Sequence, residues 1–121
     1  MTVQCYRDLE VWQLAVELVT LVYRSTASFP KEETYGLTNQ IRRAAVSVPS
    51  NIAEGQGRRS TREFLHHLSI ARGSLMEVQT QAEIAKRLLY LKQEPADQVS
   101  QLSASVARLL NGLINALDRK L

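Results

Sequence analysis

The sequence has too few cysteines and too short apolar runs to belong to several large classes of protein. Its single cysteine, Cys5, has no partner in the chain, which excludes internal disulfides and favours a reducing compartment. No apolar run approaches the ~20 residues of a membrane span, and the N-terminal segment lacks the basic and apolar regions of an export signal. We therefore expect a cytoplasmic protein that is neither exported nor inserted into a membrane.

The chain also carries little net charge. Lys and Arg number 15 against 12 Asp and Glu, and a net charge of +3 is too small by itself to indicate a nucleic-acid binder. The positive excess lies between residues 41 and 75, where every basic residue is an arginine. With 121 residues, of which 45% are hydrophobic, the chain (1–121) is long enough to form one domain with its own core.

Apolar residues recur at alternating three- and four-residue steps along most of the chain, which predicts helices. The longest such stripe runs from Phe64 to Leu89, and a helix of that length needs partner helices to bury it. The predicted helices span residues 8–27, 36–56, 60–91 and 95–118. No alternation typical of strands and no repeat is present, so the sequence predicts an all-α, antiparallel up-down-up-down four-helix bundle.

Local signals indicate where the helices begin. Asp8 is the predicted N-cap of the first helix. Ser60, with Glu63 three residues later, has the spacing of a capping box and begins the third. Pro95 is expected at the first position of the fourth helix, where its missing N–H costs nothing.

The second helix contains a proline and ends in glycines. Pro49 lies inside its apolar pattern, which predicts a kink or local break there. Gly55 and Gly57 are expected to close the helix as C-caps. They match a phosphate-binding loop only weakly, because they follow a helix and lack both a third glycine and a Lys-Ser/Thr pair.

The first helix has more apolar surface than one bundle core requires, since only a narrow polar stripe interrupts it. The C-terminal half of the fourth helix is similarly apolar. Both features predict that a second copy of the protein covers these surfaces. The residues expected at such an interface are Val11, Leu14, Leu18, Leu21, Leu110, Ile114 and Leu117.

Five arginines in the basic middle third are candidates for contact with phosphate groups. They are Arg42, Arg43, Arg58, Arg59 and Arg62. The alternative is structural, because arginines beside a helix start can pair with Glu54 or Glu63. In an oligomer, any such patch would be multiplied by the number of copies.

The sequence contains no complete set of residues for catalysis or for metal binding. Glu63 and His66 have the Glu-x-x-His spacing of di-iron bundles, but that site needs the motif twice, and His66 and His67 are the only histidines. No nucleophile comes with a base, and Trp12 lies among apolar residues at helical spacing, as packing residues do. We expect no metal, cofactor, small-molecule substrate or enzymatic activity.

The sequence resembles one protein family along most of its length. The segments that carry the resemblance are residues 8–12, 29–33, 35–37, 40–55, 57–59, 63–64, 68–71, 73–75 and 77–91. They are similar to the four-helix-bundle proteins encoded by intervening sequences of bacterial 23S ribosomal RNA genes. The resemblance implies a cytosolic bundle that assembles into a ring, typically a homopentamer, with no known enzymatic activity.

A more remote similarity connects the sequence to the accessory variability determinant protein of diversity-generating retroelements. That protein shares the bundle and the pentameric ring, and binds nucleic acid and a reverse transcriptase through basic residues. Two hypotheses follow for this chain. The first is an oligomeric scaffold or adaptor, with a protein partner where it acts as an adaptor; the alternative is a module that binds RNA or DNA through its arginines on the assembled ring.

Overall fold

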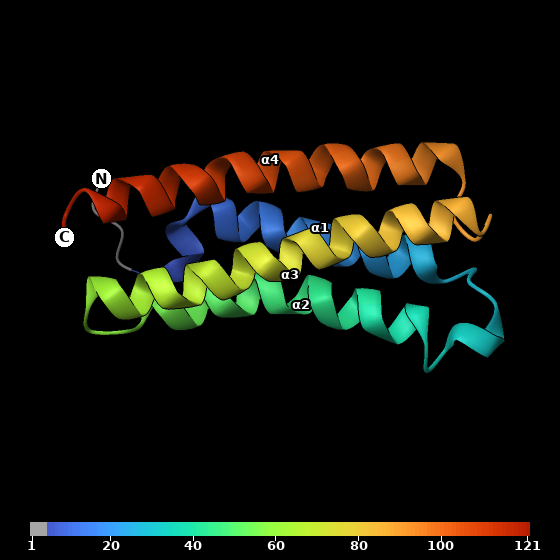
Figure 1. The fold of residues 1–121 in the computed structure, drawn as a ribbon, viewed down its shortest axis with the longest axis horizontal. Coiled ribbons are helices and arrows are strands. Elements are labelled where there is room, and N and C mark those ends of the chain that lie inside the picture. The colour runs from blue at the N-terminus through green and yellow to red at the C-terminus, as the bar shows by residue number, and fades with distance from the viewer. Residues whose placement is uncertain (1–4) are drawn as a thin grey trace.

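The computed structural model describes residues 5–121 and consists mainly of four long helices (Figure 1). These are α1 (Glu10–Thr26), α2 (Leu37–Gln56), α3 (Thr61–Arg87) and α4 (Gln93–Asp118). Two short 3-10 helices, η1 (Tyr6–Asp8) and η2 (Lys31–Glu33), precede α1 and connect it to α2. Residues 5–121 contain no strand, and the prediction of an all-α four-helix bundle is confirmed.

Consecutive helices lie side by side and run in opposite directions along the long axis (Figure 1). α1 packs against α2 and α4, and α3 packs against the same two helices, so α1 and α3 occupy opposite corners. The start of α1, the α2–α3 turn and the end of α4 lie at one end of the bundle (Figure 1). Among residues 5–121, none of the helices combines the length and hydropathy required of a membrane span.

The core is aliphatic and follows the apolar stripes of the sequence. Each helix turns one stripe inward, because side chains three and four residues apart lie on the same face. Fully burying one leucine, isoleucine or valine side chain contributes about 1.5–3 kcal/mol. The largest fully buried side chains include Leu18, Val22, Ile41, Val48, Ile52, Leu68, Leu75, Val78, Val99, Val106 and Leu110.

α1 begins two residues later than the sequence predicted. Asp8 belongs to η1, where its Oδ2 accepts a hydrogen bond from the Cys5 N–H (3.4 Å). Leu9 occupies the N-cap position of α1, and its apolar side chain accepts no hydrogen bond from the first turn. Glu10 follows in the first turn, where its negative charge favours the positive end of the helix dipole.

The α3–α4 connection also differs from the prediction. α3 ends at Arg87, four residues early, because Leu89 adopts a left-handed conformation with φ of 65° and the chain turns. The Tyr90 N–H then donates to the Ala85 carbonyl (2.9 Å). α4 begins at Gln93, which makes Pro95 its third residue, still within the first turn, where backbone N–H groups have no helical partner.

α2 continues across Pro49 without a break. The following turn carries a side-chain support, since the Asn51 amide Nδ2 donates to the Ser47 carbonyl (2.9 Å) and to the Ser47 Oγ (3.0 Å). A kink at Pro49 stays a prediction.

Glu33 connects the two loops at the far end of the bundle. Its Oε1 accepts from the Leu37 N–H (2.9 Å) at the start of α2, and its Oε2 accepts from the Tyr90 hydroxyl (3.2 Å) after α3. The Tyr90 ring packs 5.8 Å from the ring of Phe29. Burial raises the pKa of Tyr90, and its bond to the Glu33 carboxylate raises it further.

Candidate functional site

The five candidate arginines occupy two separate places. Arg42 and Arg43 lie in the second turn of α2, whereas Arg58, Arg59 and Arg62 surround the α2–α3 turn. At 1.5 Å per residue, Arg42 and Arg58 are about 24 Å apart along the helix direction. The five therefore do not form a single surface on one chain.

Arg42 is held by the end of α1. Its Nε donates to Thr26 Oγ1 (2.9 Å), its Nη2 donates to the Tyr23 carbonyl (3.3 Å), and its guanidinium lies 4.5 Å from the centre of the Tyr23 ring. Thr26 is itself buried and donates to the Val22 carbonyl (2.8 Å). These contacts make Arg42 a structural link between α1 and α2.

The three arginines at the α2–α3 turn are all exposed. Arg58 Nη2 forms an ion pair with Glu54 Oε2 at 3.3 Å, one helical turn away, and about half of each side chain is exposed. Arg59 and Arg62 have no hydrogen bond or ion pair with any residue between 5 and 121. Arg43, in the other group, is likewise exposed and lines a shallow groove between α2 and α3.

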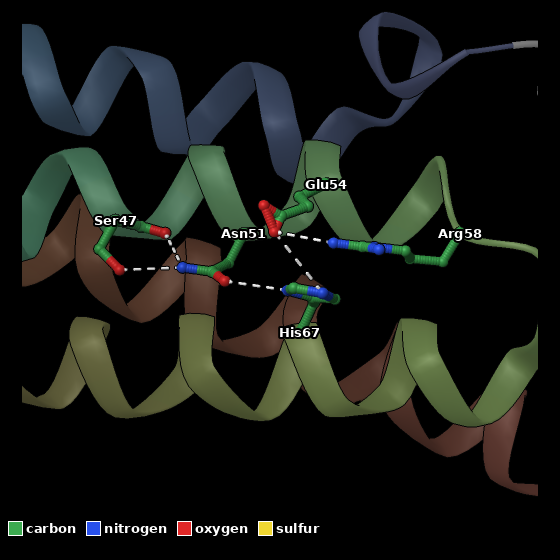
Figure 2. Close-up of polar contacts among 5 residues, drawn as sticks. All are labelled: Ser47, Asn51, Glu54, Arg58 and His67. Atoms are coloured by element: carbon green, nitrogen blue, oxygen red, sulfur yellow. Dashed lines mark hydrogen bonds and ion pairs between the residues drawn. The ribbon is translucent and has the colours of Figure 1, made fainter.

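Glu54 also belongs to a polar cluster that joins α2 to α3 (Figure 2). We use "polar cluster" for Ser47, Asn51, Glu54, Arg58 and His67. In Figure 2 the His67 ring, which comes from α3, faces Asn51 and Glu54 of α2. Its Nδ1 is 3.1 Å from Asn51 Oδ1, and its Nε2 is 3.6 Å from Glu54 Oε2. Ser74 of α3 extends the contact by donating to Ser47 Oγ at 2.8 Å.

The bonding pattern fixes which His67 nitrogen carries a proton. The Ser47 carbonyl can only accept, so the Asn51 atom that faces it must be the amide nitrogen. The remaining Asn51 atom is then the oxygen, which accepts, so His67 Nδ1 must donate. His67 Nε2 in turn faces the Glu54 carboxylate, toward which a second N–H on the ring would carry a positive charge.

Gly55 allows the two helices to approach closely at this point. A Cβ atom at this buried position would lie 2.7 Å from the His67 Cβ and 3.0 Å from the Phe64 Cδ1. Gly55 is therefore a close-packing position inside α2, which corrects the prediction that it caps the helix. Gly57 is the C-cap residue, in an ordinary right-handed conformation.

The start of α3 is capped as predicted. The Glu63 N–H donates to Ser60 Oγ (3.1 Å), and the Ser60 hydroxyl lies 3.1 Å from Glu63 Oε1. His66 is exposed and lies edge to face with the His67 ring, with centroids 5.5 Å apart. Within residues 5–121, no three His, Cys, Asp or Glu side chains gather in a way that could hold a metal ion.

The residues predicted at an oligomer interface divide into two groups. Four of them lie in the core of their own bundle, so the chain itself already covers their apolar surface. These core residues are Val11, Leu18, Leu110 and Leu117. Leu14, Leu21 and Ile114 are partly exposed at the edge of the core, and they alone retain surface for a second copy.

Sequence reasoning missed an apolar surface on the outer side of α3. Several of the large hydrophobic side chains exposed in the structure lie there, among them Met76 (58% exposed), Ile84 and Leu88 (51% exposed). Met76 and Ile84 line one shallow groove with Glu83 and Arg87. The signal is present in the sequence, since residues 76, 80, 84 and 88 are spaced four apart, but the stronger inward stripe concealed it. We call Met76, Ile84 and Leu88 the α3 outer face.

A charged pair borders the α3 outer face. Arg87 Nε donates to Glu83 Oε2 at 2.9 Å. This hydrogen bond and the positive charge of Arg87 hold the pKa of the Glu83 carboxyl below its usual range. Both side chains are well exposed, so the pair contributes little to stability and keeps its charges at the surface.

The fold defines a class of protein, namely the all-α four-helix bundles. The family model described as 23S rRNA-intervening sequence protein matches residues 7–112. The chain therefore belongs to the 23S rRNA-intervening sequence protein family.

A solved structure has the same fold. It is the crystal structure of a protein with unknown function from the S23 ribosomal protein family of Bacteroides thetaiotaomicron, similar with a TM-score of 0.77. The two sequences are 22% identical, and the match covers 86% of this chain and 97% of the other. At that identity the likeness establishes the fold. A comparison with curated proteins found no match.

Proposed function

We propose that this protein is a non-enzymatic, self-associating scaffold or adaptor of the cytoplasm, and that its assembly is a homopentameric ring. The observation that carries the proposal is apolar surface left exposed on two sides of one bundle. The α3 outer face is one, and the partly exposed Leu14, Leu21 and Ile114 form the other. Contiguous exposed apolar side chains mark interaction sites in soluble proteins.

The two surfaces lie on different sides of the molecule, as a ring requires. Rings form by contacts between two different faces of each copy, whereas a two-fold dimer uses the same face twice. α3 and α1 occupy opposite corners of the bundle, so the α3 outer face points away from α1. One face of each copy can then meet the other face of the next. The number five rests on the family resemblance alone.

Sedimentation velocity at micromolar concentration tests the proposal. We expect a species with five times the mass of one chain, and a double variant Met76→Glu, Ile84→Glu that sediments as a monomer with unchanged helix content. Both residues are exposed, so the charges do not enter the core. Ile84→Glu alone should weaken assembly, and Val46→Glu on α2, with 40% exposure against 43% for Ile84, is its matched control and should assemble normally. A wild-type monomer would reject the proposal.

A second candidate function is nucleic-acid binding at the α2–α3 turn. The observation that favours it is that Arg59 and Arg62 are exposed and unpaired within residues 5–121, next to Arg58. Arginine forms strong bidentate contacts with phosphate, and a ring would present this group several times. We name these three residues the turn arginines.

Salt-dependent binding of a short fluorescent RNA tests this second function. Binding should weaken steeply with salt, and Arg59→Ala with Arg62→Ala should reduce the slope of log K against log salt by about 0.7 per lost contact. The double variant Lys31→Ala, Lys92→Ala removes equal charge from exposed residues at the opposite end of the bundle, away from the α3 outer face, and should retain the slope. Equal behaviour of both double variants would reject the turn arginines as the binding site.

A further inference from the structure

Two groups on different helices approach the same carboxylate oxygen. Arg58 Nη2 lies 3.3 Å and His67 Nε2 lies 3.6 Å from Glu54 Oε2. Arg58 is always charged, whereas histidine is the side chain whose charge changes between about pH 5 and pH 8. A proton on His67 Nε2 would therefore bring a second positive charge to this carboxylate.

The other side of the ring is already fixed. Asn51 Oδ1 accepts from His67 Nδ1 in either charge state, so an added proton has only Nε2 to occupy. His67 Nε2 lies 3.6 Å from Glu54 Oε2, and the side chain of His67 is only 13% exposed, which limits the screening of this contact by water. Glu54 then has a cationic partner on α3 in addition to Arg58.

We propose that His67 is a proton-dependent switch: once its Nε2 carries a proton, Glu54 is shared between His67 and Arg58, so Arg58 is less neutralised and joins Arg59 and Arg62 in binding the phosphate groups of nucleic acid. This regulation rests on the second candidate function above. With neutral His67, Glu54 and Arg58 cancel in charge. With charged His67, the three groups carry a net charge of +1, and Glu54 no longer neutralises Arg58 alone.

The titratable and charged groups around the His67 ring come from the two helices that meet there. α2 contributes Glu54 and, through the same oxygen, Arg58. α3 contributes His66, which stacks edge to face on the ring. Within residues 5–121, no hydrogen bond or ion pair joins the ring to α1 or α4. His66 is exposed and has no contact with Glu54, which makes it the natural control.

The first test follows binding of a short fluorescent single-stranded RNA at about pH 8 and about pH 6. In wild type and in His66→Gln, acidification should steepen the salt dependence of binding by about 0.7, the value of one phosphate contact on a single strand. His67→Gln should lack this increase. Glu54→Gln should show the steeper slope already at pH 8. An equal pH response in His66→Gln and His67→Gln overturns the switch.

The second test needs no nucleic acid, and it separates failure of the switch from failure of the binding function. NMR of ¹⁵N-labelled protein follows the His67 ring nitrogens and the Arg58 side-chain N–H during a pH titration. We expect the Arg58 signal to move with the midpoint of His67 in wild type and in His66→Gln, but not in Glu54→Gln. An Arg58 signal that stays fixed while His67 titrates overturns the proposal. Coupled signals without RNA binding at any pH retain the switch and reject the nucleic-acid function.

Discussion

The α2–α3 side of the bundle and the α1–α4 side are built from different kinds of contact. Across α2–α3, Gly55 permits close approach, and side-chain hydrogen bonds join Ser47 to Ser74 and Asn51 to His67. Across α1–α4, no side-chain hydrogen bond is found within residues 5–121, and each helix contributes aliphatic residues to the core, among them Leu18 of α1 and Leu110 of α4.

The two sides of the bundle therefore have different roles: one determines how its helices align, and the other contributes stability. Hydrogen bonds have direction and fixed partners, so the α2–α3 contacts set the register of one helix against the other. Aliphatic contacts are non-directional and roughly proportional to buried area. The α1–α4 side therefore contributes stability, and it retains edge residues such as Leu14 and Leu21 for other partners.

The largest expected effect is on the apolar side. Leu18→Asp places a carboxyl group where the native side chain is completely buried, and a cost of about 5 kcal/mol is as large as the net stability of many small domains. We expect loss of the helical signal in far-UV circular dichroism at 25 °C. Thr20→Asp, exposed two residues along the same helix, should keep it. A folded Leu18→Asp protein would show that the α1 core position is wrongly placed.

The close approach of α2 and α3 predicts the next effect. Gly55→Ala should destabilise the protein by about 2 kcal/mol in urea unfolding, because the new Cβ overlaps His67 and Phe64. At Gly73 and Gly112 an added Cβ would meet no atom of the described part of the chain within 4 Å, so Gly73→Ala and Gly112→Ala should each stabilise by about 0.5–1 kcal/mol through helix propensity. The three glycine-to-alanine substitutions thus distinguish Gly55, which allows close packing, from Gly73 and Gly112, which have open space around them. A uniform response would contradict the close approach.

Two buried serines sharpen the comparison further. Ser103 on α4 is completely buried, and its Oγ has no hydrogen-bond partner among residues 5–121, so Ser103→Ala should stabilise by about 1 kcal/mol. Ser74 on α3 donates to Ser47, so Ser74→Ala should destabilise by about the same amount. The midpoints of urea unfolding measure both. Changes of the same sign would contradict the difference between the two sides.

The smallest effect concerns the loops at the end of the bundle. Burial and the Glu33 carboxylate raise the pKa of Tyr90, so the folded state favours the neutral phenol. The resulting stabilisation is complete below the tyrosine pKa of the unfolded chain and is lost as the pH rises through the higher folded value. Ultraviolet titration should show one tyrosine that ionises late. Glu33→Gln should lower the pKa of Tyr90, because it removes the carboxylate that accepts from the phenol. Glu32 has no hydrogen bond to Tyr90, so Glu32→Gln should lower this pKa less.

The sequence was sufficient to predict the number of helices and most of their inward faces, because the periodicity is strong and, outside α1, one face of each helix is clearly the most apolar. Helix ends were less accurate. The 3-10 turn at Asp8 and the left-handed Leu89 are accompanied by local backbone hydrogen bonds, but neither residue type demands its conformation, so the sequence carries no clear signal of either.

The candidate site was harder to predict than the fold. Arg42 resembles the turn arginines in sequence, and only the structure shows it bound to Thr26 and the Tyr23 carbonyl. Leu18 and Leu14 are both apolar residues on one helix, yet their burial differs because burial depends on the neighbouring helix. The contact of Asn51 with His67 joins residues sixteen apart, and its formation requires Gly55. Spacing within one helix carries no information about such pairs.

The order in which the helices are connected also has a consequence for how quickly the molecule forms. Three of the four neighbouring pairs are consecutive in the chain, and only α1 with α4 joins distant segments. Bundles dominated by such short-range pairings fold in microseconds to milliseconds. We expect α2 and α3, joined by a four-residue turn, to pair early. The docking of α1 on α4 closes the longest loop, so its entropic cost makes it the last step.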